Sequence, residues 1–246
     1  MDHDVCIVGG GVAGLSTAIF TARAGLDTLV VNDGEPILYR NASLENFPGF
    51  PKGVDARRFH QQTLAQAEEA GATFLDGRVT DVTASDGDDG FVVTVDESDE
   101  LTTGRVVAAS WSDASYLEGT GVNTEKRGSK TYVFVDEVGR TNVDGIYAAG
   151  RLADQYHQAI VCAGHGATVG VTIVHDSDEN FYHDWVAPEG YFTGRDRDVP
   201  PGCEEIDDEE RLARDEAARD AMFAYTEPLD DEPRMHPSVD LDDEEE

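Results

Sequence analysis

The chain has 246 residues, and its 51 acidic side chains outnumber its 18 basic ones, which gives a net charge of −33. This charge argues against nucleic acid or an anionic membrane as a partner. No apolar run reaches the roughly 18 residues that a membrane helix needs, and the three cysteines include no Cys-x-x-Cys pair, so neither a disulfide scaffold nor a dithiol centre is expected. We expect a cytoplasmic protein with one main domain and no membrane segment.

The excess of acidic residues extends over the whole chain. Residues 204–246 hold 19 acids and four arginines, but the other 203 residues still hold 32 acids against 14 bases. Lysine is also scarce, with three in the chain. Because a body of like charges repels itself unless salt screens it, the pattern favours a halophilic type of protein. An ordinary acidic protein with a disordered tail is the alternative.

The first thirty residues predict a β-strand, a glycine turn, a helix and a second buried strand. The apolar run 4–8 leads into Gly9–Gly14, the helical stretch 15–24 ends at Gly25, and residues 29–31 form the second run. This order is typical of a parallel βαβ unit. Residues 35–53 are rich in proline and glycine and predict a loop, whereas residues 55–70 have helical spacing.

The middle of the chain predicts strands, and later parts predict two further helices. Strand-like runs occur at 73–75 together with 78–82, at 91–95 and at 105–109, and the Asp/Gly-rich turn at 86–90 makes the second run a hairpin partner of the first. Residues 110–130 are polar and weakly patterned. Further strands are expected at 132–135 and 145–148, a helix of small residues at 158–174, and a charged helix near 207–224.

These elements predict an α/β fold: a Rossmann-like domain with a central parallel sheet and an added small β-meander, followed by an acidic C-terminal extension. We expect the main domain over residues 1–175, an irregular extension that packs on it over 176–203, and an acidic tail with one helix, partly disordered, over 204–246.

The spacing Gly9-x-Gly11-x-x-Gly14 predicts a dinucleotide site. In such a motif the first glycine permits the tight turn, the second lets the backbone approach a pyrophosphate, and the third lets the helix pack on the strand. The helix N-terminal amides then hold the phosphates. The motif alone is weak, but here it follows a strand and opens a helix. The acid that usually binds the ribose belongs at the end of the second strand, where the chain has Asn32 and Asp33.

Three motifs in order resemble the low-molecular-weight thioredoxin reductases, which belong to the two-dinucleotide-domain flavoproteins. They are the glycine turn, the segment Glu45-Asn46-Phe47-Pro48-Gly49, and residues 145–150 followed by 158–166. The resemblance covers 1–109 and 131–175, the two halves of the family's FAD domain. It implies that Val79 meets the adenine through its backbone, that Asn46 lies beside the flavin, and that the helix opened by Gln158 and Ala159 points at the isoalloxazine ring. The FAD-contacting residues predicted from the turn and the resemblance are Gly9, Gly11, Val12, Ala13, Gly14, Asn32, Asp33, Asn46, Val79, Gly150, Arg151, Gln158 and Ala159.

The chain also departs from this family. Only residues 110–130 stand where the family inserts its nicotinamide-binding domain, and there is neither a second G-x-G-x-x-G nor a Cys-x-x-Cys. Ser110-Trp111 replaces the usual Thr-Gly, and Arg151 replaces the acid that binds the ribityl chain. Losing one charge-assisted hydrogen bond costs about 1.5–3 kcal/mol, so FAD affinity could survive. Arg151 could also approach the pyrophosphate.

Two functions remain open at this stage. The first is an FAD-dependent oxidoreductase that passes electrons between an external donor and acceptor, the donor being a reduced ferredoxin, a diffusing nicotinamide or a small thiol. The second is a non-catalytic flavin or nucleotide module that senses or scaffolds. No catalytic residue or metal site is assigned. The surface left by the missing domain favours self-association into a homo-oligomer.

Overall fold

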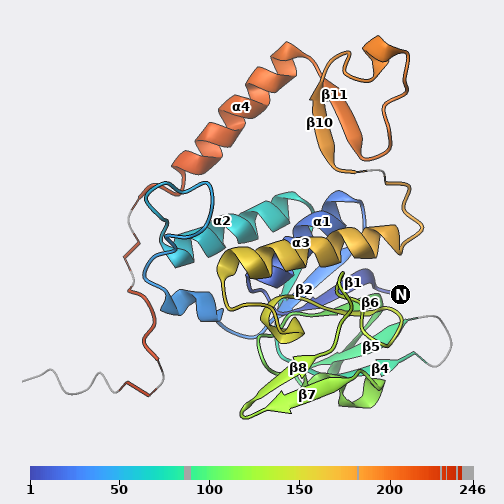
Figure 1. Ribbon diagram of the computed structural model, residues 1–246, viewed down its shortest axis with the longest axis vertical. Coiled ribbons are helices and arrows are strands. Elements are labelled where there is room, and N and C mark those ends of the chain that lie inside the picture. The colour runs from blue at the N-terminus through green and yellow to red at the C-terminus, as the bar shows by residue number, and fades with distance from the viewer. Residues whose placement is uncertain (86–89, 182, 228, 231, 237, 240–246) are drawn as a thin grey trace, which may run out of the picture.

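A seven-stranded sheet lies at the centre of the computed structural model, which describes residues 1–85, 90–181, 183–227, 229–230, 232–236 and 238–239 (Figure 1). Its strands run in the order β3-β2-β1-β6-β5-β4, and β9 pairs with β6. The strands of this sheet are β1 (His3–Val8), β2 (Thr28–Asn32), β3 (Thr73–Asp76), β4 (Val79–Ala84), β5 (Phe91–Val95), β6 (Asp99–Ala108) and β9 (Ile146–Ala148).

The long strand β6 joins a parallel and an antiparallel part of the sheet. Its second half pairs in parallel with β1 and β9, whereas its first half pairs antiparallel with β5, which in turn pairs antiparallel with β4. Strands β1, β2 and β3 are parallel. The predicted Rossmann-like α/β fold with a parallel sheet and an added meander is therefore confirmed.

The predicted hairpin is present, but the run 73–82 is divided. Strand β4 pairs with β5 from Ala84 opposite Phe91, while residues 86–89 of the predicted turn lie outside the described residues. Residues 73–76 pair with β2 at the other edge of the sheet. The sequence grouped these two strands because only Gly77 and Arg78 separate them. They nevertheless have different partners.

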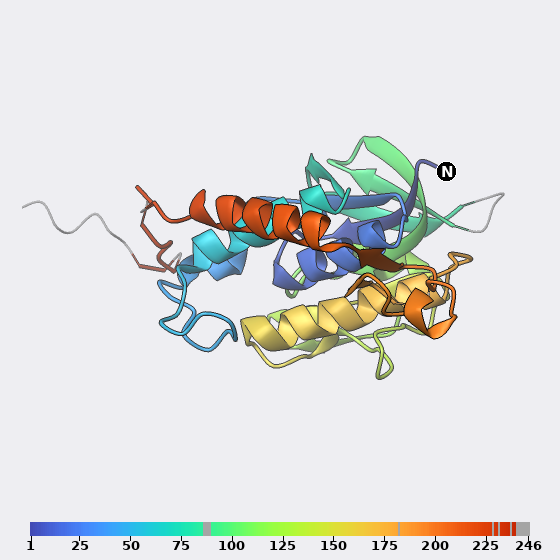
Figure 2. The same ribbon diagram turned by 90° about the horizontal axis from the view of Figure 1, so that it is seen from above.

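Three helices lie together on one face of the sheet, namely α1 (Val12–Arg23), α2 (Ala56–Glu69) and α3 (Ala159–His175) (Figures 1 and 2). Helices α1 and α3 approach closely because α3 carries glycine at the contact. A Cβ at Gly166 would lie 2.1 Å from the carbonyl oxygen of Ala13. Thr17 Oγ1 donates to the Gly166 carbonyl at 2.9 Å across the same contact.

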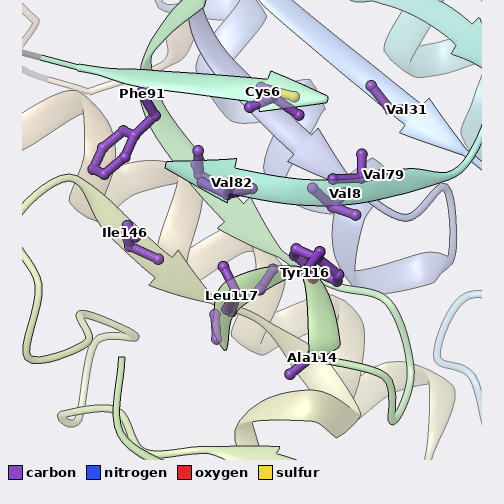
Figure 3. Close-up of a cluster of buried hydrophobic side chains, with 14 of the residues drawn as sticks. Cys6, Val8, Val31, Val79, Val82, Phe91, Ala114, Tyr116, Leu117 and Ile146 are labelled. Atoms are coloured by element: carbon purple, nitrogen blue, oxygen red, sulfur yellow. The ribbon is translucent and has the colours of Figure 1, made fainter. Parts of the chain in front are cut away.

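Alternation along β1 divides the core between the two faces of the sheet. Val5 and Ile7 pack among α1 and α3, whereas Cys6 and Val8 pack on the side of the meander, where Figure 3 shows them with Val82, Phe91 and Leu117. Both faces are covered, which explains why the first strand reads as a continuous apolar run.

Residues 110–130 are folded against the body, in place of the weakly patterned segment that the sequence suggests. The short helix η2 (Ser115–Thr120) packs on β4 and buries Tyr116 and Leu117 in the core. Strand β7 (Thr124–Arg127) then forms an antiparallel hairpin with β8 (Lys130–Val133). The remaining short helices are η1 (Ile37–Arg40), η3 (Gly150–Ala153) and η4 (Thr193–Arg195).

The segment 176–203, expected to be irregular, contains β10 (Trp185–Pro188), which pairs in parallel with β11 (Cys203–Ile206). The Glu205 carboxylate organises the loop between them, since it accepts hydrogen bonds from the backbone N–H groups of Gly190, Phe192 and Thr193. The predicted charged helix is α4 (Asp208–Phe223), which buries no side chain and stands off the body in Figure 1. None of the described helices has the length and apolar character needed to cross a bilayer.

Candidate functional site

A cavity of about 880 Å³ lies where the parallel strands end. The glycine turn after β1, the end of β2 and the segment after β6 contribute to its wall, as do the loop 35–46 and the start of α3. Ligands of open α/β folds bind at the carboxyl ends of the strands, and the volume lies within the range of small-molecule and cofactor sites.

The three glycines of the motif have different structural roles. Gly9 has φ +113°, and a Cβ there would lie 2.6 Å from the Ala109 carbonyl oxygen. A Cβ at Gly14 would lie 2.0 Å from the Gly9 carbonyl oxygen. A Cβ at Gly11 would meet no heavy atom within 4 Å, because this position faces the open cavity. Thus Gly9 and Gly14 permit close packing, while Gly11 leaves space for a ligand.

Two side chains hold the peptide groups of Gly10. The Gly10 N–H donates to Oδ1 of Asn32 at 2.8 Å, and Nε2 of His60 donates to the Gly10 carbonyl at 2.7 Å. The Tyr39 hydroxyl lies 3.3 Å from Nδ1 of the same histidine. Burial lowers the pKa of His60, although its bond to Gly10 opposes the shift. His60 therefore fixes the turn from α2, fifty residues away in the chain.

Asn32 thus has a role that the sequence did not predict. Its Oδ1 accepts from Gly10, and its Nδ2 donates to the Gly34 carbonyl at 2.6 Å, so both ends of the amide contact backbone. Asp33 also lines the cavity, is exposed, and lies 3.9 Å from Arg78. Of the two residues, only Asp33 carries a carboxylate, and the Asn32 amide is already bonded to backbone at both ends.

The two helices that start at the cavity have no side-chain cap, whereas the other two α-helices do. Gly11 precedes α1 and Gln158 precedes α3, and neither gives a capping hydrogen bond. In contrast, Asp55 caps α2 and Asp207 caps α4. Uncapped N-terminal amides carry partial positive charge and bind anionic groups. Two such termini therefore open on one cavity.

Asn46 and Gln158 meet at the start of α3. Asn46 Nδ2 donates to Oε1 of Gln158 at 2.7 Å, although the two residues are 112 positions apart. Both line the cavity together with Ala159 and Cys162. Burial raises the pKa of the Cys162 thiol. The loop 35–46 and the N-terminus of α3 are thereby joined in one wall.

Arg151 lies in this wall but is directed towards β8. Its Nη2 donates to the Tyr132 hydroxyl at 2.6 Å, and its Nη1 donates to the Gln155 carbonyl at 2.9 Å. Its Nε is buried and forms no hydrogen bond to the described residues. The predicted approach to a pyrophosphate stays a prediction.

Of the thirteen predicted contact residues, the eleven other than Gly14 and Gly150 line the cavity. Gly14 packs against Gly9, and a Cβ at Gly150 would lie 2.5 Å from the Cβ of Ala13. Gly14 and Gly150 therefore permit close packing beneath the residues that line the cavity. The sequence missed most of the loop wall, because proline and glycine indicated a loop but not its position. The residues that line the cavity but were not among the predicted contacts include Glu35, Pro36, Ile37, Leu38, Arg40, Asn41, Ser43, Leu44, Glu45, Arg78, Ser110, Trp111, Asp113, Tyr116 and His157.

The cysteines and histidines near the site do not form a reactive pair. Cys6, Cys162 and Cys203 are free, and burial raises the pKa of Cys6 to about 12. His165 accepts a hydrogen bond from the Gly150 N–H at 3.1 Å, which indicates a structural role. Within the described ranges, no group of His, Cys, Asp or Glu is arranged to hold a metal ion.

Comparisons with known proteins agree with this geometry. The FAD dependent oxidoreductase family matches residues 4–46, and the pyridine nucleotide-disulphide oxidoreductase family matches residues 44–166. The thioredoxin reductase of Rickettsia bellii is 32% identical over 124 residues, which are 50% of this chain and 38% of that protein. That of Listeria monocytogenes is 37% identical over 84 residues, covering 32% of this chain and 25% of that protein. The chain therefore spans well under half the length of these curated relatives.

Solved structures show the same fold at low sequence identity. An oxidoreductase from Agrobacterium tumefaciens has a TM-score of 0.64 at 18% identity, covering 72% of this chain and 98% of that one. Thioredoxin reductase from Lactococcus lactis has a TM-score of 0.62 at 15% identity, covering 71% and 100%. The pyridine nucleotide-disulphide oxidoreductase profile ends within α3, the helix whose start completes the cavity wall. Because this profile spans half of the chain, the chain belongs to the pyridine nucleotide-disulphide oxidoreductase family of FAD-dependent enzymes.

Proposed function

We propose that the cavity holds FAD and that the chain is an oxidoreductase that exchanges electrons with an external donor and acceptor. The observation that carries the proposal is the pair of uncapped helix N-termini, α1 and α3, which open on one cavity while Asp55 and Asp207 cap the other two α-helices. A cofactor with a pyrophosphate at one place and a ring that becomes anionic at another needs two such termini.

The pyrophosphate would lie over the glycine turn. The backbone of Gly11, Val12 and Ala13 would bind it, because a Cβ at Gly11 would meet nothing and the cavity reaches this backbone. Asp33 would bind the adenosine ribose, and Val79 would lie at the adenine. Asn32 would act indirectly, by holding the N–H of Gly10 at 2.8 Å and so fixing the turn.

The isoalloxazine end would lie at the start of α3. Bound FAD supplies the redox chemistry, since its ring takes up and releases electrons. The amides of Ala159 and the following residue would stabilise negative charge on that ring. Asn46 and Gln158, joined at 2.7 Å, would hold the loop wall in place against it. Tight contact at this point would also exclude water from the ring.

We further propose that the chain does not use the disulfide route of thioredoxin reductases. That route needs two neighbouring thiols and a second dinucleotide motif, and the sequence has no Cys-x-x-Cys. Cys6 is fully buried in β1 and Cys203 lies in β11, on a different sheet. Electron transfer would therefore run directly between the flavin and an external partner.

Purification followed by a graded reductant series tests the proposal. We expect a yellow protein that releases FAD on denaturation, bleaches with reductant and reoxidises in air. A variant in which Cys6, Cys162 and Cys203 are replaced by alanine should behave in the same way. Absence of any adenine dinucleotide would refute the FAD site. Bound FAD that cannot be reduced would favour the non-catalytic module. NADPH-linked disulfide reduction that disappears in the cysteine-free variant would refute the direct route.

A further inference from the structure

Cationic residues gather on the β7–β8 hairpin, although the chain is strongly acidic. Residues 124–130 contain Lys126, Arg127 and Lys130 with one acid, Glu125, whereas the chain as a whole has 51 acids and 18 bases. Two of the three lysines of the chain are in these seven residues. We call residues 124–130 the cationic hairpin. Figure 1 shows this hairpin protruding from the body.

Stacked side chains connect the cationic hairpin to the cavity. The Lys130 ammonium lies 5.5 Å from the centre of the Trp111 ring, and this ring packs edge-on against His157 at 4.6 Å. Arg127 and Arg151 each lie 4.8 Å from the centre of the Tyr132 ring. Since Trp111, His157 and Arg151 also line the cavity, one cationic and aromatic surface runs from the hairpin to the proposed flavin site.

The carboxylates nearby neutralise only part of this charge. Arg127 pairs with Glu125 and with Asp154 at 2.6 Å, and Arg151 lies 3.4 Å from the same aspartate. Neither Lys126 nor Lys130 forms an ion pair with the described residues. On the hairpin face shared by Arg127, Lys130 and Tyr132, the cations Arg127, Lys130 and Arg151 outnumber the carboxylates Glu125 and Asp154, on a chain whose net charge is −33. Lys126 adds a further positive charge on the other face of the same hairpin. Burial together with the charges of Arg151 and Lys130 lowers the pKa of His157, which is consistent with a positive local potential.

Trp111 is held in a costly backbone conformation. Its φ is +65°, in the left-handed region that bulky side chains rarely adopt, and such strained residues cluster at functional sites. A tryptophan kept at this point places its ring between the cationic hairpin and His157. Trp, Tyr and Arg are also the residues that dominate the binding energy of protein interfaces.

We propose that the cationic hairpin, together with Trp111 and His157, is the docking surface for an acidic electron-carrier protein; this rests on the function proposed above. The acidic body of the protein repels an acidic partner, whereas the cationic hairpin attracts it. The electrostatic potential therefore raises the rate of association and orients the partner beside the flavin. A protruding hairpin fits a macromolecule better than a small ligand, which needs a concave site. Two one-electron carriers, each oxidised once, together with two protons from water balance the reduction of one FAD.

A binding measurement with a small acidic [2Fe–2S] ferredoxin tests the proposal. The double variant Lys126→Glu/Lys130→Glu is compared with Arg197→Glu/Arg219→Glu, which makes the same charge change at exposed positions in the loop before β11 and in α4. Calorimetry with oxidised ferredoxin is done at the lowest KCl concentration at which circular dichroism shows all three proteins folded, because electrostatic attraction is screened least there. It should show roughly tenfold or more weaker binding for the hairpin variant and less than about twofold for the control. Stopped-flow reduction by reduced ferredoxin should follow the same order.

Three outcomes would overturn the docking surface. They are equal weakening in both double variants, unchanged binding in the hairpin variant, and no binding of ferredoxin to the parent. Loss of NADPH binding in the hairpin variant with ferredoxin binding unchanged would assign the surface to a small anion instead. The FAD content of each protein and its photoreduction by a small-molecule donor are measured in parallel. A parent that contains no FAD refutes the proposed function, while ferredoxin binding is still decided by the calorimetry.

Discussion

Replacing Gly11 by valine should weaken FAD binding by orders of magnitude and leave the fold intact. A Cβ at this position meets no heavy atom within 4 Å, and the backbone has φ −77° and ψ 179°, which valine adopts without strain. Valine is a poorer residue than glycine before a helix, so we expect a loss of at most about 1 kcal/mol of unfolding free energy, or roughly 2–4 °C in Tm. The side chain would, however, fill the space that the pyrophosphate needs.

The effect on affinity follows from the hydrogen bonds lost. If two amide bonds to the pyrophosphate are prevented, at about 1.5–3 kcal/mol each, the Kd should rise roughly 10²- to 10⁴-fold. Titration of the flavin-free protein with FAD, followed by flavin fluorescence, measures the change. Gly164→Val is the matched control, since a Cβ there also meets nothing within 4 Å and the residue lies outside the cavity wall. Binding by Gly11→Val within tenfold of the parent would refute the assignment of the turn.

Three further outcomes are expected. Gly14→Ala should destabilise the fold by about 1–3 kcal/mol or more, because its Cβ would lie 2.0 Å from the Gly9 carbonyl oxygen; an unchanged denaturant midpoint would contradict this. His60→Leu should cost about 1–3 kcal/mol by leaving the buried Gly10 carbonyl unpaired, whereas His60→Gln should restore much of it in the same unfolding assay. The Tm should rise steeply with KCl up to molar concentrations, and deleting residues 225–246 should preserve this rise; a salt-independent melt of the shortened protein would argue against it.

Local patterns in the sequence determined most of the elements and the centre of the site. The apolar run of β1, the glycine turn and the start of α1 are adjacent in the chain, and their residue types allow few conformations. Gly25 follows the end of α1 as expected, with φ +91°, and Gly71 follows the end of α2 with φ +104°. Spacing alone also favoured a phosphate-binding backbone at Gly11, because that property needs only a missing side chain at one position.

Tertiary structure alone decided which distant side chains complete the site. The bond from His60 to Gly10 joins residues 50 positions apart, and the bond from Asn46 to Gln158 joins residues 112 apart. Neither pair has a local pattern, because the contact depends on how α2 and the loop 35–46 pack on the sheet. Long-range packing also places strands 73–76 and 79–84 at opposite edges of the sheet, because the propensity of a segment to form a strand does not specify which strand it pairs with. The sequence by itself therefore determined the turn that can approach a pyrophosphate, and long-range packing determined the walls that close around it.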